Sequence, residues 1–161
     1  MKIVVIADTH LPRGSRRLPE LLLEHLEAAD LVLHAGDFVS AALFEELRAY
    51  SRVEAVFGNQ DDGDLRTLLP ERQVVRAGEA RIGLVHDAGP RRRREERLLA
   101  AFPSCHAVVY GHTHMPQIER RSGVWILNPG SPTERRRAAR RSFLTLDVSG
   151  VSLEPRLVVT T

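Results

Sequence analysis

The segment KIVVIADTH, residues 2–10, predicts both the fold class and the start of a functional site. Residues 2–7 form a continuous and largely β-branched apolar run, which is typical of a strand buried on both faces of a sheet. Strands of this kind occur in α/β proteins, in which helices cover the sheet. Asp8 and His10 follow the strand, and both residue types bind metal ions.

Strand and helix patterns alternate along the first part of the chain, and strands dominate the rest. Apolar runs predict further strands at 31–34, 53–57 and 107–110. The spacing of apolar residues predicts helices at 18–29, 40–49 and 91–102. A loop with the sequence GNQDDGD is expected at 58–64, and a β-hairpin at 73–76 and 81–86. Short strands joined by glycine-containing turns predict a β-meander at 117–121, 124–127, 142–147 and 152–158.

Length and composition limit the class of protein. A chain of 161 residues fits one α/β domain with two sheets, which we expect to span residues 1–161. The formal net charge of +2 is too small to indicate a nucleic-acid partner, although 22 of the 23 basic residues are arginine. Cys105 is the only cysteine, and no apolar run approaches the roughly 18 residues of a membrane span. We therefore expect a cytoplasmic protein without a membrane partner.

Residues with oxygen or nitrogen ligand atoms follow five of the predicted strands. They are Asp8, His10, Asp37, Asn59, His86, His112 and His114. Because functional groups in open α/β sheets gather outside the carboxyl ends of the strands, one edge of the fold can hold all of them. Carboxylates, an amide and imidazoles without a thiolate suit Mn²⁺, Fe²⁺, Co²⁺, Ni²⁺ or Zn²⁺. The set exceeds the needs of one catalytic ion and suffices for two ions that share a carboxylate.

These motifs resemble those of the calcineurin-like metallophosphoesterases. The matching residues are Asp8-x-His10, Gly36-Asp37, Gly58-Asn59-x-Asp61, His86 and Gly111-His112-Thr113-His114. The short chain and the later Asn128-Pro129-Gly130-Ser131-Pro132 resemble the small bacterial and archaeal phosphodiesterase branch, which also includes the retromer subunit vacuolar sorting protein 29. The resemblance covers residues 8 to about 135 and implies a four-layer α/β/β/α sandwich of two mixed sheets.

The same resemblance implies a dinuclear site and a reaction. The first metal ion would be held by Asp8, His10 and His114, and the second by Asn59, His86 and His112. Asp37 would bridge the two ions, and the residues expected to be catalytic are Asp37, Asn59 and His86. We expect Mn²⁺ at both positions, with Ni²⁺, Co²⁺, Fe²⁺ or Zn²⁺ as alternatives. A hydroxide between the ions would attack phosphorus in line, so we expect a phosphodiesterase that acts on a small phosphate ester.

Two residues near the motifs are candidates for substrate binding. Gln60 stands where many relatives with efficient hydrolysis carry a histidine, and its amide can donate a hydrogen bond but cannot transfer a proton. We therefore expect low activity on esters with poor leaving groups. Arg13 follows the first motif and is a candidate for phosphate binding, with a solvated loop arginine as the alternative. The arginine cluster at 91–94 has the same two interpretations, and there a solvated helix face is favoured.

Three further residues beside the motifs have structural interpretations. His34 is expected to be a buried polar residue behind the site. Asp61 is expected to orient its loop rather than to bind metal. Asp87 is expected to begin a turn before Gly89, although a carboxylate that orients His86 is the alternative.

Other functions are also compatible with the sequence. A protein-interaction scaffold that keeps the metal site, with little or no activity, is the main alternative to the enzyme. The presence of all the candidate ligands favours the enzyme. A nuclease that uses the arginine-rich surface ranks lower, because the chain has no room for the additional capping domain of larger nuclease relatives. Homo-oligomers are compatible with all of these interpretations.

Overall fold

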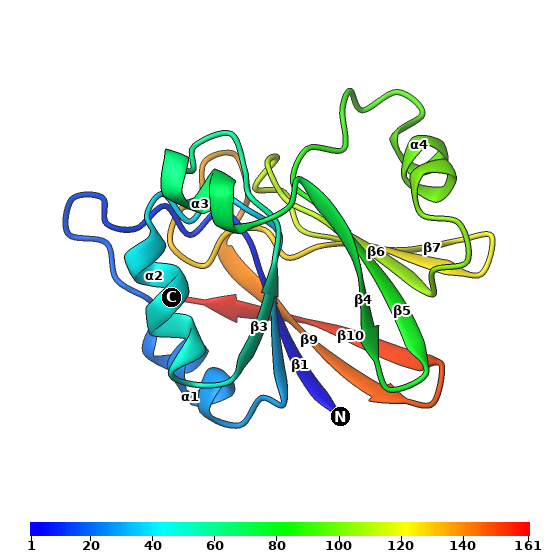
Figure 1. The fold of residues 1–161 in the computed structure, drawn as a ribbon, viewed down its shortest axis with the longest axis horizontal. Coiled ribbons are helices and arrows are strands. Elements are labelled where there is room, and N and C mark those ends of the chain that lie inside the picture. The colour runs from blue at the N-terminus through cyan, green and yellow to red at the C-terminus, as the bar shows by residue number, and fades with distance from the viewer.

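Ten strands and four helices make up the computed structural model, which describes residues 1–161 (Figure 1). The strands are β1 (Lys2–Ile6), β2 (Leu31–His34), β3 (Arg52–Ala55), β4 (Arg72–Ala77), β5 (Ala80–Val85), β6 (Ala107–Tyr110), β7 (Gln117–Arg121), β8 (Val124–Asn128), β9 (Arg141–Ser149) and β10 (Ser152–Thr160). The helices are α1 (Glu20–Glu27), α2 (Ala41–Arg48), α3 (Gly63–Leu68) and α4 (Arg94–Ala101). None of these helices has the length and apolar composition that a membrane span requires.

The strands form two mixed sheets of five strands each. The first sheet has the order β10-β9-β1-β2-β3, in which β1, β2 and β3 are parallel and the other two strands are antiparallel. The register places Val4 beside Val32 on one side and Thr145 on the other, so β1 is the central strand. The second sheet has the order β4-β5-β6-β8-β7, with three parallel strands between two antiparallel edge strands.

Three apolar clusters separate four layers and confirm the expected α/β/β/α sandwich. Successive residues of β1 point to opposite faces, so Ile3 and Val5 pack against the second sheet while Val4 and Ile6 pack against α1 and α2. A third cluster, which includes Leu98 of α4, covers the outer face of the second sheet. Helices therefore lie on both outer faces (Figure 1). This double coverage explains why β1 is apolar at consecutive positions.

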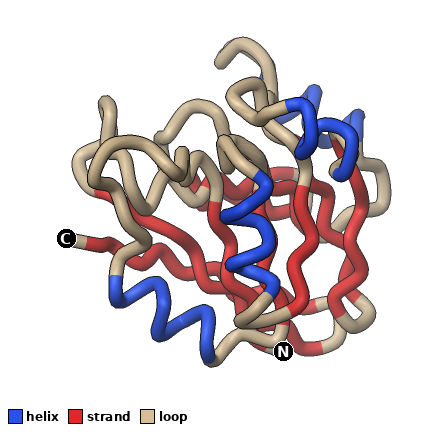
Figure 2. The backbone as a smooth tube through the Cα atoms, turned by 60° about the vertical axis from the view of Figure 1, so that its left-hand side comes forward, coloured by secondary structure: helices blue, strands red, loops and turns tan.

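The segments that follow the parallel strands of both sheets lie at one edge of the sandwich, and long loops gather on one side of the molecule in Figure 2. Backbone hydrogen bonds join these loops within each sheet. The N–H of Asp8 donates to the carbonyl of Gly36, and the N–H of Gly111 donates to the carbonyl of His86. The loops after β1, β2, β5 and β6 therefore meet in fixed positions, as expected for the functional edge of such sheets.

The predicted loop after β3 contains a short helix that the sequence analysis missed. Asp62 caps this helix, α3, because its side chain accepts a hydrogen bond from the N–H of Leu65. Leu65 is fully buried, so one apolar side chain anchors the helix to the core beneath it. The acidic residues and Gly63 obscured this helix because they are also typical of turns.

The strands after residue 116 do not form a single meander. β7 and β8 form a hairpin in the second sheet, whereas β9 and β10 return to the first sheet and pair beside β1. The turns between these strands could be recognised from glycine and proline, but turn residues do not specify which strand becomes the neighbour. The helix expected at 91–102 begins only at Arg94, because Arg93 has a left-handed backbone conformation with φ of 57°.

Gly83 provides a test of the packing between β5 and the end of α4. A Cβ atom at this position would lie 2.5 Å from Cδ1 of Phe102, which is buried. We expect Gly83→Ala to lower the free energy of unfolding by about 1–3 kcal/mol, because a packed core does not accommodate an additional methyl group without displacement. Urea denaturation followed by circular dichroism measures this change.

Gly63→Ala is the matched control, since no atom lies within 4 Å of the added methyl group. Its stability should equal or slightly exceed that of the wild type, because alanine is the better helix former. Equal stability of Gly83→Ala and the wild type would contradict the packing described for β5.

Candidate metal centre

The predicted ligand residues lie together at the edge where both sheets end. The first sheet supplies, after β1, β2 and β3, the residues Asp8, His10, Asp37 and Asn59. The second sheet supplies, after β5 and β6, the residues His86, His112 and His114. The candidate site is therefore made from both sheets and depends on how they pack against each other.

Asp8, His10 and His114 form one buried group of side chains that could hold a metal ion. Nε2 of His114 lies 3.4 Å from Oδ1 of Asp8, and Nε2 of His10 lies 3.8 Å from the same oxygen. All three residues are at most 1% exposed. One oxygen and two nitrogens therefore converge on a small region that is closed to bulk water.

Asp37 lies between this group and a second one, which consists of Asp8, Asp37 and His86. Oδ2 of Asp37 lies 3.4 Å from Nε2 of His10 and 3.3 Å from Nε2 of His86. The same carboxylate oxygen thus faces one histidine from each sheet. This is the position that a bridging carboxylate would need to occupy.

Asn59 and His112 extend the second group toward the surface. Oδ1 of Asn59 lies 3.0 Å from Nε2 of His86 and 3.0 Å from Nδ1 of His112. His112 is exposed, whereas His86 is buried. This side of the centre is therefore the side that a ligand from solvent can reach.

Four buried polar atoms of the first group have no hydrogen-bond partner: Oδ1 of Asp8, Nδ1 and Nε2 of His10, and Nε2 of His114. A buried polar atom without a partner costs on the order of 1–3 kcal/mol. The Asp8 oxygen and the two Nε2 atoms face one another, so a single cation between them would satisfy all three. A carboxylate with imidazoles is a donor set that suits divalent transition metals.

The close contacts between histidines and carboxylates shift the pKa values of the buried groups. Burial lowers the pKa of His10, but contacts with Asp37 and Asp8 outweigh it and raise the pKa to about 9. Burial raises the pKa of Asp37, yet its contacts with His10 and His86 hold that pKa well below its usual value. Burial likewise raises the pKa of Asp8, but its contacts with His10 and His114 lower that pKa below its usual value, so both carboxylates stay ionised and attract positive charge into a buried site.

Most of the candidate ligands have an unusual backbone conformation. Positive φ angles between 49° and 67° occur at Asp8, His10, Asp37, His112 and His114. This conformation costs roughly 1–2 kcal/mol at a residue other than glycine, and such strain clusters at functional sites. The backbone at Gly58 also passes close to the Asp37 side chain. A Cβ on Gly58 would lie 2.1 Å from Oδ1 of Asp37, so no larger residue fits there. The Gly-Asn motif therefore requires its glycine for space.

Asp61 orients the loop after β3, as expected from the sequence. Its carboxylate accepts hydrogen bonds of 2.7–3.0 Å from the N–H groups of Asp37, Val39 and Gly58. Arg66 of α3, which the sequence analysis did not identify, donates to the carbonyls of Asn59 and Asp61. The missed helix thus holds the loop that carries Asn59.

The turn Asn128-Pro129-Gly130-Ser131, one of the segments that carry the family resemblance, lies beside the centre. Nδ2 of Asn128 donates to the carbonyl of Gly111 at 3.0 Å and to the hydroxyl of Thr113 at 3.1 Å. Oγ of Ser131 donates to the carbonyl of Asp8 at 2.7 Å. These hydrogen bonds connect the loop after β8 with the loops that carry the ligands of the first group.

Glu134 is a residue of the centre that the sequence analysis missed. Oε2 of its carboxylate lies 4.0 Å from Nδ1 of His10, and its backbone carbonyl lies 3.4 Å from Nδ1 of His114. Burial raises the pKa of Glu134, but Arg16 and Arg136 outweigh it and place the pKa below its usual value. No sequence signal marks this residue, because its partners come from separate loops.

His34 is a buried polar residue behind the centre, as expected. Its Nδ1 accepts a hydrogen bond from the N–H of Gly36, and its Nε2 lies 3.0 Å from the hydroxyl of Thr9. A neutral imidazole with the proton on Nε2 satisfies both contacts, and the Thr9 hydroxyl then donates to the carbonyl of Asp37. Burial lowers the pKa of His34 to about 3, so the folded protein keeps it neutral.

Three other predicted residues lie outside the buried groups. The Asp87 side chain accepts a hydrogen bond from the N–H of Gly89 at 2.7 Å, which confirms the turn. Gln60 contributes its backbone N–H to Oδ1 of Asp37 at 2.8 Å, while its side chain is exposed. Arg13 is exposed in the loop after β1. Substrate contacts by Gln60 and Arg13 stay predictions.

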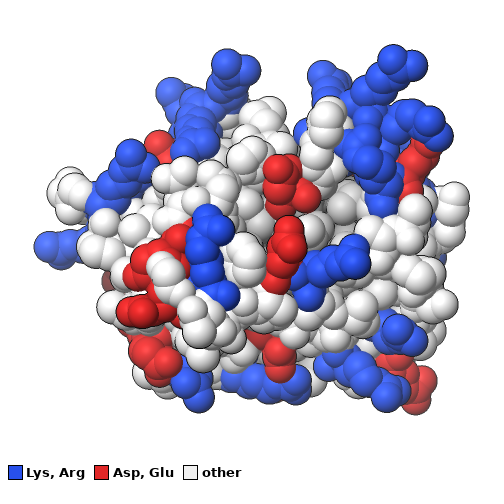
Figure 3. All heavy atoms as spheres, turned by 45° about the horizontal axis from the view of Figure 1, so that its top comes forward, with Lys and Arg blue, Asp and Glu red and all other residues white.

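Basic side chains project from the side of the molecule that carries the loops after the strands, at the top of Figure 3. Part of the cluster at 91–94 is bound within the structure: Arg93 pairs with Glu96, and Arg94 donates to the carbonyl of Gly89 and lies over the Tyr110 ring. Arg94 therefore begins α4 and packs against Tyr110, whereas Arg91, Arg92 and Arg93 are exposed before the helix. Whether the cluster contacts substrate stays a prediction.

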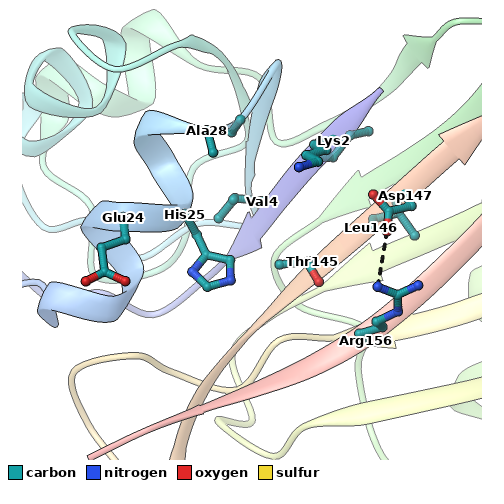
Figure 4. A pocket seen from close by; sticks show the side chains of 11 residues that line it. Lys2, Val4, Glu24, His25, Ala28, Thr145, Leu146, Asp147 and Arg156 are labelled. Carbon is teal, nitrogen blue, oxygen red and sulfur yellow. Dashed lines mark ion pairs between the residues drawn. The ribbon is translucent and has the colours of Figure 1, made fainter.

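A separate hollow of about 390 Å³ lies along α1 and the strands β1, β9 and β10 (Figure 4). Lys2 at the start of β1, His25 of α1 and the ion pair between Asp147 and Arg156 line it. None of the candidate ligands belongs to it, and Asp8 follows the opposite end of β1. Donor atoms close enough together to hold a metal ion occur in the buried groups at the strand ends and not in this hollow.

Fold and site together define an α/β/β/α protein with a buried cluster of Asp and His side chains that can bind metal. The sequence model of the calcineurin-like phosphoesterase superfamily domain matches residues 1–150. The chain therefore belongs to the calcineurin-like phosphoesterase superfamily, as its motifs indicated.

Individual relatives agree with this assignment. A probable metallophosphoesterase of Methanothermobacter thermautotrophicus is 33% identical, over 99% of this chain and 93% of the relative. A phosphodiesterase of Methanocaldococcus jannaschii is 29% identical, over 81% of this chain and 83% of the relative. Crystal structures of Vps29 from Entamoeba histolytica are also similar. A single mutant matches with a TM-score of 0.77 at 26% identity and full coverage of both chains. The zinc complex matches with a TM-score of 0.75 at 24% identity, over 99% of each chain.

His34 should make the stability of the metal-free protein depend on pH. Between about pH 6.5 and pH 3 the unfolded chain binds a proton on this histidine and the folded chain does not, so stability falls as the pH falls. The contribution is about 1.4 kcal/mol per pH unit. His34→Asn keeps an acceptor for the Gly36 N–H but does not titrate in this range.

The measurement is the free energy of unfolding of the wild type and His34→Asn in chelator, from pH 6 to pH 4. We expect a shallower slope in the variant by about 1.4 kcal/mol per pH unit. Parallel slopes would show that the buried histidine is not held neutral.

Proposed function

We propose that the protein is a dinuclear, metal-dependent phosphodiesterase that acts on small phosphate esters. The observation that carries this proposal is the convergence of buried, unpaired ligand atoms of Asp8, His10 and His114 beside the carboxylate of Asp37. Membership of the calcineurin-like phosphoesterase superfamily supports the phosphoesterase activity. The similarity to an archaeal phosphodiesterase supports the diester preference.

The seven predicted ligands can be divided between two ions. Asp8, His10 and His114 would hold the first ion, and Asn59, His86 and His112 the second. Asp37 would contribute to both, because Oδ2 faces His10 and His86. We propose Mn²⁺ as the native metal, since its carboxylate, amide and imidazole preferences match this set. When bound, two such ions supply a positive clamp for phosphate and an activated water for in-line displacement.

The contribution of this chain is a rigid and partly dry site. The N–H of Gln60 donates to Oδ1 of Asp37, which leaves Oδ2 free for the metal centre. Nδ1 of His86 lies 2.7 Å from the carbonyl of Ala35, so a proton on Nδ1 fixes the ring with Nε2 toward the centre. Because His112 is exposed and the first group is buried, the substrate would approach from the Asn59 and His112 side.

The central test is hydrolysis of bis-p-nitrophenyl phosphate by metal-free protein before and after addition of Mn²⁺. We expect turnover only with the metal, and a loss of at least about 100-fold in Asp37→Ala, because both groups lose a shared ligand. Asp147→Ala is the matched control and should keep wild-type activity, because this partly exposed aspartate pairs with Arg156 and belongs to neither buried group. Binding of two equivalents of Mn²⁺ without turnover on any phosphate ester would instead support the scaffold alternative.

Gln60 should limit the range of leaving groups. Its amide lies on the loop that contacts Asp37 but cannot supply the proton that a poor leaving group needs. We expect activity to fall steeply as the pKa of the leaving alcohol rises, and Gln60→His to restore about 10-fold or more on alkyl esters. The comparison of kcat on p-nitrophenyl and alkyl diesters measures this effect. An equal change on both substrates would refute a role for position 60 in proton donation.

A further inference from the structure

The buried histidines of the centre share one orientation. His10, His86 and His114 each direct Nε2 toward the carboxylates of Asp8 or Asp37. A histidine that binds metal through Nε2 carries its proton on Nδ1, and an acceptor for that proton fixes the ring and raises the basicity of the ligand atom. The acceptors that lie near the Nδ1 atoms of these three residues therefore indicate how each ring is held.

Two of the three Nδ1 atoms face a backbone carbonyl. Nδ1 of His86 lies 2.7 Å from the carbonyl of Ala35, and Nδ1 of His114 lies 3.4 Å from the carbonyl of Glu134. Nδ1 of His10 is buried and has no hydrogen-bond partner. The carboxylate of Glu134 lies 4.0 Å from it, about 1 Å beyond hydrogen-bond distance.

The Glu134 carboxylate is held at this place by two arginines from different segments. Arg16, in the loop after β1, contacts both carboxylate oxygens at 3.0 and 3.4 Å. Nε of Arg136 lies 3.5 Å from Oε2, the oxygen that faces His10. The side chain is 21% exposed, so the carboxylate is not enclosed on every side. A two-point contact of this kind fixes the orientation of a carboxylate.

We propose that Glu134 is a positioning residue for the metal centre, whose carboxylate accepts the Nδ1 proton of His10 and thereby directs Nε2 of His10 to the first ion. The proposal rests on the proposed function, because it requires that His10 binds metal. It assigns a role to a loop residue outside the ligand motifs. It also assigns Arg16 and Arg136 to holding that carboxylate, rather than to binding substrate phosphate.

The test is the binding of Zn²⁺ alone to metal-free protein, followed by competition with a chromophoric chelator. The wild type should bind two equivalents. Glu134→Ala should weaken one of them by about 10–100-fold, which is the usual effect of losing a partner of a ligand histidine, and leave the other within about 3-fold. Glu134→Gln keeps an oxygen that can accept the Nδ1 proton without the negative charge, so its loss should be smaller.

Glu54→Ala is the matched control. Glu54 has a similarly buried side chain, 26% exposed, and pairs with Arg52 at 2.6 Å on β3, away from every candidate ligand. Both equivalents of Zn²⁺ should bind to this variant as they bind to the wild type. Thermal unfolding of each variant in chelator reports separately on the loss of the ion pairs.

The outcomes separate the two proposals. A wild type that binds no Zn²⁺ would overturn the proposed function itself. Wild-type binding of both equivalents by Glu134→Ala would overturn the role of Glu134 alone. An equal weakening of both equivalents, together with a lower melting temperature in chelator, would also overturn it, because Glu134 would then only join two loops. If Glu134→Ala does not fold, the isosteric Glu134→Gln decides: selective weakening of one equivalent supports the proposal and unchanged binding overturns it.

Discussion

The arrangement of the centre depends on the contacts of one buried carboxylate, that of Asp37. Its two oxygens contact the loops after β1, β3 and β5, through His10, the N–H of Gln60 and His86. A buried charge is tolerated only where the surroundings provide partners, so each of these loops has to lie where it can reach the same side chain. The two sheets are therefore coupled by electrostatics at their carboxyl edge as well as by the apolar layer between them.

The centre combines several features that do not favour folding by themselves. Stability is reduced by left-handed backbone at five candidate ligand positions, by unpaired buried atoms in the first group and by a histidine that burial keeps neutral. A cation that binds only the folded state offsets part of this cost in proportion to its affinity and concentration. The remaining stability comes from the apolar clusters on either face of the first sheet, in which the central strands are almost fully buried.

The candidate ligands could be located from the sequence because two simple constraints act together. A strand covered on both faces is apolar throughout, so Asp8 and Asp37 stand out where such strands end. Glu134 and Arg66 carried no comparable signal. Glu134 reaches the centre because Arg16 in another loop and Arg136 hold its carboxylate, and Arg66 acts through α3, a helix that the sequence pattern does not predict. The return of β9 and β10 to the first sheet was hidden for the same reason, because it depends on contacts between distant segments.

That return has a consequence for how the protein is made. β1 pairs on one side with β2, which follows soon in the sequence, and on the other with β9, which places Lys2 opposite Asp147. Contacts between residues so far apart form slowly, and during synthesis the strand that precedes Asp8 lacks one of its neighbours until β9 has been translated. Asp8 and His10 are thus the first candidate ligands to be synthesised and among the last to be held in place. An exposed β1 edge is the segment most in need of protection from premature association.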